Sequence, residues 1–255
     1  MQIEGKRIIV TGGSSGLGEA AVRVFVREGA AVAVLDVQDK AGDSVVAKAN
    51  DEGPGRAAYH HCDVRRREAV RAAFESAVAD LGGLDALVHL AGIDMLAPAE
   101  SITEEDWDRV IGINLKGTFL VNQAAFPYLR EAGGRIINVT SSAGLAAAPG
   151  RAHYAASKGG IASLTRALAA EWGRYGINVV ALSPVAYTPM TESFRATLSS
   201  DGLAAFDAAM TGIPLGRMGD AETDIAPVLV FLVSNASRYI TAQIIAVDGG
   251  TVPVR

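Results

Sequence analysis

Residues 7–18 read RIIVTGGSSGLG, a short apolar run followed by four glycines within seven residues. The run Arg7–Val10 is β-branched, and an alanine- and valine-rich helical pattern follows the glycines to about Gly29. A strand, a glycine-rich turn and a helix in this order are typical of a dinucleotide-binding turn, although ordinary strand-to-helix turns also contain glycine. Glycine lets the backbone approach a pyrophosphate, and the helix N-terminus offers free N–H groups to it. We therefore expect cofactor contacts from Gly12, Ser14, Ser15, Gly16, Leu17 and Gly18.

The second predicted strand, Ala31–Leu35, is followed by an acidic residue. Asp36 is placed there to accept hydrogen bonds from the adenosine ribose and to repel the additional phosphate of NADP. Ser15, and not a cation, stands beside Gly16, so no basic residue in the turn is placed to neutralise that phosphate. The sequence thus favours NAD, with Asp36 and Val37 as contacts. A solvated strand end or a helix cap is the alternative interpretation of Asp36.

Apolar runs and helical patterns alternate along the whole chain. The strand-like runs are almost wholly apolar, as expected for a parallel sheet covered on both faces. The alternation predicts an α/β doubly wound, Rossmann-like sheet with helices on both faces. No break in composition divides the chain, so we expect one domain over residues 1–255. The further predicted strands are Ala57–Cys62, Asp85–Gly92, Arg135–Thr140, Ile177–Leu182 and Ile244–Val247, and the further helices cover about 40–50, 65–81, 103–114, 116–131, 154–174 and a segment from Asp220.

The segment 185–214 carries Met190, Phe194 and Leu198 at four-residue spacing, followed by further apolar residues. This pattern predicts two short helices that form a lid over the site, although ordinary packing explains the same stripe. An apolar lid indicates a small-molecule substrate that is itself moderately apolar.

Asp63 and Val64 follow the third predicted strand, at the carboxyl edge where open α/β sheets bind ligands. Asp63 is placed either to accept a hydrogen bond from the adenine amino group or to cap the helix predicted from Arg65. One carboxylate serves only one of these roles fully, and the sequence leaves both open. The basic run Arg65–Arg67 is interpreted as a solvated first turn of that helix.

Tyr154 and Lys158 are four residues apart in a predicted helix, so their side chains share one face. A neighbouring ammonium favours the phenolate, which predicts a lowered Tyr154 pKa and a proton acceptor for a substrate hydroxyl. A chance helical pair is the alternative. The fifth strand brings Ser141 and Ser142 to the same edge, where a hydroxyl could donate to a substrate oxygen. Asn114 lies in an apolar helical pattern, so its amide is either bonded structurally or holds a water.

Composition narrows the classes of function. The 255 residues are 49% hydrophobic and carry 23 basic and 28 acidic side chains, a net charge of −5. The basic residues are scattered, which argues against nucleic acid or an anionic membrane as a partner. Cys62 is the only cysteine, and no signal peptide or membrane-spanning run is visible, so the sequence predicts a cytoplasmic protein. The four histidines lack metal-ligand spacing, so no metal is predicted, and His153 is expected on the surface or in a loop.

Together these motifs resemble the classical type of the short-chain dehydrogenase/reductase family over essentially the whole chain. The turn Thr11–Gly18 matches the family's cofactor turn, and Asn114 matches its helix asparagine. Tyr154 and Lys158 match the catalytic pair, and Ser141 lies at the family's usual spacing before the tyrosine. The chain is similar in these respects to bacterial NAD-dependent hydroxysteroid and secondary-alcohol dehydrogenases.

The resemblance implies hydride transfer between a secondary alcohol carbon and a nicotinamide ring. It implies that Tyr154 takes or gives the hydroxyl proton and that Ser141 holds the substrate oxygen. It gives Lys158 the task of lowering the tyrosine pKa and binding the nicotinamide ribose, and it gives Asn114 a water that relays the proton. It also implies cofactor contacts from Asp63, Val64, Ala91, Gly92, Tyr154, Lys158, Pro184, Val185 and Thr188.

Two segments depart from the family's pattern. His89-Leu90 replaces two asparagines whose amides commonly brace the central sheet, and His89 is expected to be a packed strand residue. Pro184 is followed by Val185 rather than glycine, and Thr188 lies one residue closer to the proline than usual. This second departure alters the segment that the resemblance assigns to the nicotinamide carboxamide.

Three hypotheses follow. The first is an NAD-dependent oxidoreductase that interconverts a secondary alcohol and a ketone. The second is an NADP-dependent ketone or 3-oxoacyl reductase, which the negative charge of Asp36 disfavours. The third is an NAD-binding sensor without turnover, which only the altered segment 184–188 supports. The resemblance also implies a homotetramer or homodimer, and the apolar helices around Leu115–Leu129 and Ile161–Leu168 would suit its contacts.

Overall fold

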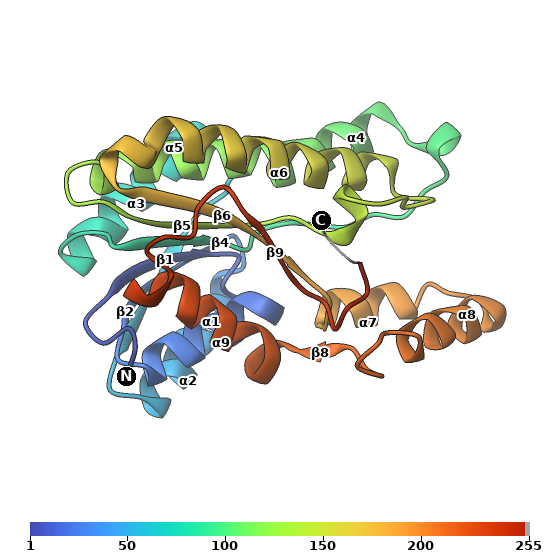
Figure 1. Cartoon of the computed structure of the whole chain (residues 1–255), viewed down its shortest axis with the longest axis horizontal. Coiled ribbons are helices and arrows are strands. Elements are labelled where there is room, and N and C mark those ends of the chain that lie inside the picture. Colours follow the sequence, from blue (N-terminus) through green and yellow to red (C-terminus); the bar gives the residue numbers. More distant parts are fainter. Residues whose placement is uncertain (253–255) are drawn as a thin grey trace.

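The computed structural model describes residues 1–252, so the last three residues of the predicted domain lie outside the described residues. Its centre is a seven-stranded sheet in which every neighbouring pair of strands is parallel (Figure 1). The strand order β3-β2-β1-β4-β5-β6-β9 confirms the predicted doubly wound sheet. The strands are β1 (Arg7–Thr11), β2 (Ala31–Asp36), β3 (Arg56–His61), β4 (Ala86–His89), β5 (Gly134–Val139), β6 (Ile177–Pro184) and β9 (Ile244–Val247).

Helices cover both faces of the sheet, as predicted: α1, α2 and α9 pack on one face and α3, α5 and α6 on the other (Figure 1). None of the helices within residues 1–252 is both long and apolar enough to span a bilayer. The helices are α1 (Gly16–Arg27), α2 (Asp39–Glu52), α3 (Arg67–Leu81), α4 (Glu104–Val110), α5 (Gly117–Leu129), α6 (Ala152–Trp172), α7 (Pro189–Arg195), α8 (Ser200–Thr211) and α9 (Ala226–Val233).

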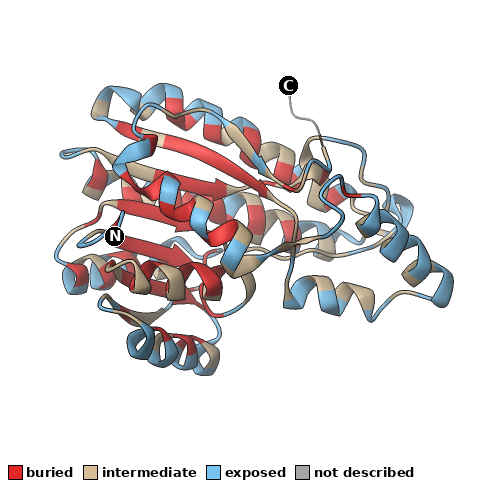
Figure 2. Cartoon of the chain, turned by 60° about the horizontal axis from the view of Figure 1, so that its bottom comes forward, coloured by how far each residue is buried: buried red, intermediate tan, exposed pale blue. Residues whose placement is uncertain are grey.

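Strand β1 illustrates how the apolar runs build two cores. Successive side chains of a strand point to opposite faces, so Ile8 and Val10 join the core that contains Phe25 of α1, whereas Ile9 joins the core that contains Phe74 of α3. The side chains of these three strand residues and two phenylalanines are all buried. Burial of one such side chain contributes about 1.5–3 kcal/mol. In Figure 2 the central strands are accordingly buried, with exposed residues on the outer helices.

The order in which strands are added to the sheet reverses direction at β1. The chain runs from β1 outward to β2 and β3 and then returns to β4 on the other side of β1. Thr11 and His89 are register partners at the carboxyl ends of β1 and β4. Ligands of open α/β sheets bind in the crevice at this point, because the connections leave the two strand ends in opposite directions.

Helices α4 and α5 are not separated as predicted. A π-helical turn, Ile111–Lys116, joins them into one continuous helical segment. The wider turn displaces the carbonyl groups from the regular ladder, and the Thr118 hydroxyl donates to the Asn114 carbonyl oxygen at 2.5 Å. Such turns are rare and often occur at functional sites.

The predicted lid consists of two short helices, α7 and α8, as expected. The strand pair β7 (Ala186–Tyr187) and β8 (Gly219–Asp220), which was not predicted, closes the base of the lid segment. Neither lid helix has a buried residue, so both lie at the edge of the molecule with little packing beneath them (Figure 2).

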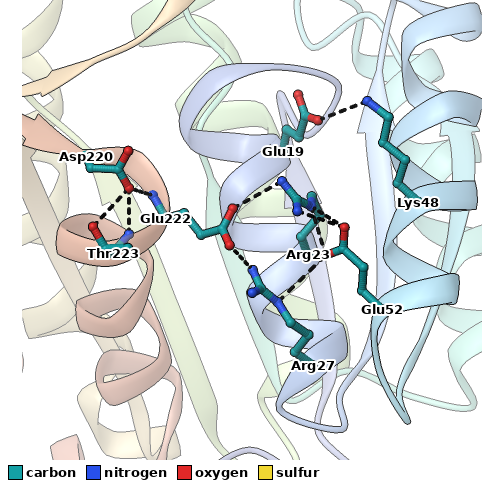
Figure 3. Close-up of polar contacts among 8 residues, drawn as sticks. All are labelled: Glu19, Arg23, Arg27, Lys48, Glu52, Asp220, Glu222 and Thr223. Atoms are coloured by element: carbon teal, nitrogen blue, oxygen red, sulfur yellow. Dashed lines mark hydrogen bonds and ion pairs between the residues drawn. The ribbon is translucent and has the colours of Figure 1, made fainter.

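An ion-pair network anchors the chain where it returns from the lid (Figure 3). Arg23 of α1 contacts Glu52 of α2 at 2.7 Å and Glu222 of the turn after β8 at 3.1 Å. Arg27 joins the same two carboxylates. Asp220 accepts hydrogen bonds from the backbone N–H of Glu222 and of the next residue, which fixes that turn. The network therefore ties the chain just after the lid segment to α1, the helix that follows the glycine turn.

Candidate active site

The glycine turn holds two backbones in direct contact. Gly12 has φ +68°, and a Cβ atom there would lie 2.5 Å from the backbone N of Ala91, at the end of β4. A Cβ on Gly18 would lie 1.9 Å from the carbonyl oxygen of Gly12. Among the described residues, the side chain of Ser15 before α1 makes no capping hydrogen bond, which leaves the first N–H groups of the helix for an anionic ligand. The turn is therefore shaped as the predicted dinucleotide cradle requires.

A cavity of about 440 Å³ opens beside this turn. Its volume lies in the ordinary range of cofactor sites. It extends from the glycine turn past the ends of β2 and β3 to the lid. Of the predicted cofactor contacts it contains Gly12, Ser15, Gly16, Leu17, Gly18, Asp36, Val37, Asp63, Val64, Ala91, Gly92 and Thr188.

Asp36 lines this cavity and also supports the turn. Its carboxylate accepts hydrogen bonds from the backbone N–H of Val37 at 2.7 Å, of Gln38 at 3.1 Å and of Ser14 at 3.2 Å. Ser14, a predicted contact, is buried and does not line the cavity. The three N–H groups hold a negative charge at the cavity wall, at the end of β2 where the sequence predicts it.

Asp63 does not cap a helix. Helix α3 begins at Arg67, two residues later than predicted, and Arg66 before it makes no side-chain cap among the described residues. Instead, the Asp63 carboxylate binds the guanidinium of Arg65, with 2.7 Å between Oδ2 and Nη2, and this pairing keeps the Asp63 pKa below its ordinary value. Arg65 is exposed as predicted, but it lies before the helix and lines the cavity. The adenine role of Asp63 stays a prediction.

A second cavity of about 310 Å³ continues the first towards the lid. Leu17, Gly92 and Thr188 border both cavities, so the two form one cleft. The second cavity contains the predicted residues Ser141, Tyr154, Lys158, Pro184 and Val185, and its remaining wall includes Asp94, Arg151, Met190, Phe194, Phe206, Met210 and Met218.

Lys158 points its ammonium at the sheet. Nζ donates to the carbonyl oxygen of Val139 at 2.9 Å and lies 5.6 Å from the centroid of the Tyr154 ring. Burial lowers the Lys158 pKa to about 8, and the charge of Asp94 opposes this shift. The shared helix face predicted from the spacing is therefore present, with the ammonium beside the ring.

The predicted direction of the Tyr154 pKa shift is wrong in this structure. Burial of the phenol raises its pKa to about 12, and the carboxylate of Asp94 adds to the rise, whereas a hydrogen bond with Ser141 and the charge of Arg151 oppose it. Desolvation disfavours the charged phenolate more than the surrounding cations favour it. Ser141 also accepts from the backbone N–H of Ala143 at 3.2 Å, which orients its hydroxyl.

Asn114 is bonded structurally, the first of the two predicted alternatives. Its side chain accepts from the backbone N–H of Ile93 and donates to the carbonyl oxygen of Ile93, each at 2.9 Å. The same amide nitrogen donates to the Ser157 hydroxyl at 3.1 Å. Asn114 lines neither cavity. It fixes the segment after β4 to the helix that carries the tyrosine.

Two histidines are buried, one of them against expectation. His89 is packed in β4 as predicted, and its Nδ1 lies 2.6 Å from the Thr11 hydroxyl, a bond that joins β1 to β4. Burial lowers the His89 pKa to about 3, and the charge of Lys158 adds to the lowering. His153 is completely buried, so the expected surface or loop position is wrong. It lies in the first turn of α6, whose adjacent face also packs inward.

The shortened segment after β6 remains attached to the sheet. Val185 N–H donates to the carbonyl oxygen of Val247 at 3.0 Å. Thr188 caps α7 and borders both cavities, so it stays at the cleft despite the missing residue. Within residues 1–252 no group of three or more histidine, cysteine, aspartate or glutamate side chains could hold a metal ion.

Sequence reasoning missed several polar residues of the cleft. Asp94 and Arg151 line the second cavity, and Arg65 and Arg109 line the first. Asp94 follows Gly92 closely, and its place beyond a predicted strand end was the signal that could have found it. Arg151 and Arg109 carried no comparable signal, because their positions depend on loop and helix packing.

The chain is similar to known proteins over almost its whole length. Residues 12–252 match the family described as "Enoyl-(Acyl carrier protein) reductase". The chain is 40% identical to the 3-oxoacyl-[acyl-carrier-protein] reductase FabG of Thermotoga maritima, over 99% of this chain and 100% of that protein. It is 37% identical to the D-threitol dehydrogenase of Mycolicibacterium smegmatis, over 98% and 94%.

A further relative and two solved structures extend this similarity. The 2,5-dichloro-2,5-cyclohexadiene-1,4-diol dehydrogenase of Sphingobium indicum is 37% identical over 97% of both chains. The structure of levodione reductase aligns with a TM-score of 0.92 at 31% identity, covering 97% of this chain and 98% of that one. A short-chain type dehydrogenase/reductase from Mycobacterium marinum aligns with a TM-score of 0.90 at 31% identity, covering 99% and 98%.

Proposed function

The chain belongs to the short-chain dehydrogenase/reductase family, and we propose that it is an NAD-dependent oxidoreductase that interconverts a secondary alcohol and a ketone. One observation carries the proposal: a single cleft runs from the carboxylate of Asp36 to the hydroxyl and ammonium groups of Ser141, Tyr154 and Lys158. A nicotinamide dinucleotide bound in the first cavity would supply the hydride acceptor or donor. The second cavity, which contains Ser141, Tyr154 and Lys158, would then hold the alcohol or ketone substrate.

The residues of the second cavity have different roles in proton transfer and substrate binding. The Tyr154 phenol, which is hydrogen-bonded with Ser141, takes the hydroxyl proton during oxidation or returns it during reduction. The Ser141 hydroxyl holds the substrate oxygen and donates to it as negative charge develops there. Lys158 keeps a positive charge beside the ring. The methionine and phenylalanine side chains that line the second cavity suit a moderately apolar substrate.

The charges at the other end of the cleft favour NAD. A second phosphate on the adenosine ribose would face the carboxylate of Asp36. Arg65 does not offset this repulsion, because its guanidinium is already bound to Asp63 through Nε and Nη2. The second cation of the cavity, Arg109, comes from α4, in the part of the chain between β4 and β5 rather than beside β2.

We expect Asp36→Ala to narrow the preference for NAD over NADP about tenfold or more, since the change removes a charge that repels the additional phosphate. Calorimetric titration with each dinucleotide measures the ratio. Asp43→Ala is the matched control, because Asp43 is exposed on α2 and does not line the cavity. An unchanged ratio in Asp36→Ala would contradict the assignment of Asp36 as the discriminating residue.

A 3-oxoacyl reductase that uses NADP is the second candidate. Its support is the 40% identical reductase of Thermotoga maritima together with the matching family. The test is nicotinamide absorbance across a panel of secondary alcohols, ketones and 3-oxoacyl thioesters, with NAD(H) and NADP(H) in parallel. Oxidation of simple alcohols with NAD supports the first candidate, and reduction confined to thioesters with NADPH supports the second. Tight dinucleotide binding without any turnover would support the sensor hypothesis instead.

The charges around Tyr154 predict a pH effect. The charge of Asp94 raises the Tyr154 pKa, the charge of Arg151 lowers it, and the Lys158 ammonium lies 5.6 Å from the ring centroid. Asp94→Asn removes this negative charge and lowers that pKa, so more phenolate is present at a given pH. We expect the acidic limb of the kcat profile for alcohol oxidation to move to lower pH. A limb that stays in place or moves to higher pH would show that Asp94 does not act on the base.

We also propose a cytoplasmic homotetramer or homodimer. The exposed Phe119 of α5 and the half-buried Leu164 of α6 support this assignment. Light scattering of the purified protein tests the oligomeric state.

A further inference from the structure

Arg151 is a cation of the second cavity whose hydrogen-bond donors are not used by the protein itself. Its guanidinium lies 4.8 Å from the centroid of the Phe194 ring, and Nη1 lies 3.4 Å from Oδ2 of Asp94. At this distance the ion pair is longer than a good hydrogen bond. The side chain of Arg151 donates no hydrogen bond to any group in residues 1–252. The guanidinium, which carries five N–H groups, therefore retains donors for a ligand.

These donors are accessible. Arg151 lines the second cavity, and its side chain is 28% exposed. Among the described residues, the buried arginine nitrogens without a partner belong to Arg27 and Arg135, and none belongs to Arg151. The unbonded N–H groups of Arg151 are thus open to water, and a ligand that replaces this water can accept hydrogen bonds from them.

Arg151 is also held close to the candidate base. Its backbone N–H donates to the carbonyl oxygen of Ala148 at 3.2 Å, and its own carbonyl oxygen accepts from Ala155 N–H at 2.8 Å. The Phe194 ring packs against the guanidinium through a cation–π contact. Burial raises the Tyr154 pKa, and the charge of Arg151 opposes this rise, so the guanidinium lies within electrostatic reach of the phenol.

The charged side chains of the second cavity have a positive sum. They are two cations, Arg151 and Lys158, and one carboxylate, Asp94, which leaves one positive charge in excess when all three are ionised. A substrate with a single negative charge would neutralise this excess. The planar fork of a guanidinium matches the geometry of a carboxylate and donates to it through charge-assisted hydrogen bonds. The cavity is therefore suited to a monocarboxylate.

We propose that Arg151 determines specificity for secondary alcohols that also carry a carboxylate, by donating hydrogen bonds to that carboxylate. The substrate class is a hydroxy acid, or the oxo acid formed from it. The proposal rests on the proposed function, because Ser141 and Tyr154 place the reacting hydroxyl. The apolar side chains of the same cavity, among them Met190 and Phe206, would contact the hydrocarbon part of such a substrate.

The same arrangement separates the two candidate functions. A 3-oxoacyl thioester carries a neutral carbonyl where the hydroxy acid carries a carboxylate. Hydrogen bonds to a neutral acceptor are about half as strong as those to a charged one. Arg151 therefore favours a free acid over its neutral derivatives, which include the thioester.

The test uses 2-hydroxybutyrate and 3-hydroxybutyrate as substrates of the full chain with NAD. Each acid is compared with its amide, which has nearly the same shape but no charge. A hydrogen bond to a charged group changes affinity about tenfold to a hundredfold, so we expect kcat/KM of at least one acid to exceed that of its amide about tenfold or more. The ratio of kcat/KM within a pair cancels any general loss of activity.

Arg151→Gln should lower this ratio about tenfold, because glutamine offers only a neutral donor. Arg151→Lys should retain more of the ratio than Arg151→Gln, since lysine keeps the charge but not the planar fork. Arg174→Gln is the matched control. Arg174 also lies over an aromatic ring, 4.9 Å from the centroid of Tyr175, but it lines neither cavity, so the ratio should stay unchanged.

The outcomes separate this inference from the function on which it rests. Equal or lower kcat/KM for the acid in both pairs, measured in the unmodified protein, overturns the role of Arg151 and keeps the dehydrogenase, and this comparison needs no variant to fold. Oxidation of 2-butanol but of neither hydroxy acid has the same meaning.

An acid preference that survives Arg151→Gln unchanged also overturns the role of Arg151, because a merely structural residue would lower kcat/KM for acid and amide alike. Failure to oxidise any of these alcohols, or to reduce 2-butanone, with either dinucleotide, in protein that binds NAD by calorimetry, overturns the proposed function itself.

Discussion

Tyr154→Phe is expected to lower kcat for alcohol oxidation about a thousandfold while dinucleotide binding stays within about twofold of the unmodified protein. The change removes one hydroxyl and with it the proposed proton acceptor. Phenylalanine keeps the ring, which is the part of the side chain that lies beside the Lys158 ammonium at 5.6 Å. Packing around the ring is retained, so the loss should appear in the chemical step. Steady-state absorbance of the reduced nicotinamide measures kcat, and calorimetry measures dinucleotide affinity.

The control for this change is Tyr239→Phe. Tyr239 is 98% exposed and lies outside both cavities, so loss of its hydroxyl should leave kcat and dinucleotide affinity as they were. Turnover of Tyr154→Phe at the level of the unmodified protein would transfer the base role to another group. The cavity offers one other candidate acceptor, Asp94, whose own pKa is raised by burial. Comparison of kcat between Tyr154→Phe and Asp94→Asn would then show which of the two side chains accepts the proton.

The parts of the fold that sequence reasoning predicted are those fixed by local pattern. The residues from Arg7 to Gly18 specify strand, turn and helix by composition alone, and β1 and α1 begin close to where the pattern predicts. The almost wholly apolar strand runs likewise predicted a sheet covered on both faces, and alternate residues such as Ile8 and Ile9 do face opposite layers. The family resemblance that these motifs suggested is confirmed by the comparisons.

The parts that could not be predicted depend on what surrounds a side chain in space. The spacing of Tyr154 and Lys158 is visible in the sequence, but the burial that raises the tyrosine pKa depends on the folded surroundings of the phenol. His153 was expected outside because it adjoins Tyr154 on a helix, yet its side chain is completely buried. Asp94 became a candidate only when the structure placed it in the wall of the second cavity.

Gly18→Ala is expected to lower the free energy of unfolding by about 1–3 kcal/mol and to weaken dinucleotide binding about tenfold to a hundredfold. A Cβ at this position would lie 1.9 Å from the Gly12 carbonyl oxygen and 2.7 Å from Cα of Gly13. Both atoms belong to the backbone, so no side-chain rotation relieves the overlap, and the start of α1 must move away from the turn. Gly12 has no room to follow, since its own Cα position is packed against Ala91.

Displacement of α1 acts on binding through the N–H groups at its start, which must point at one place to hold a phosphate. Each hydrogen bond to a charged oxygen is worth about 1.5–3 kcal/mol, so the loss of one explains the expected change in affinity. Gly173→Ala is the matched control: a Cβ there meets no atom within 4 Å, and its φ of −55° suits alanine. Thermal unfolding and calorimetric titration with NAD measure the two effects. Native stability together with native affinity in Gly18→Ala would mean that the contact between α1 and the turn is not what shapes the dinucleotide site.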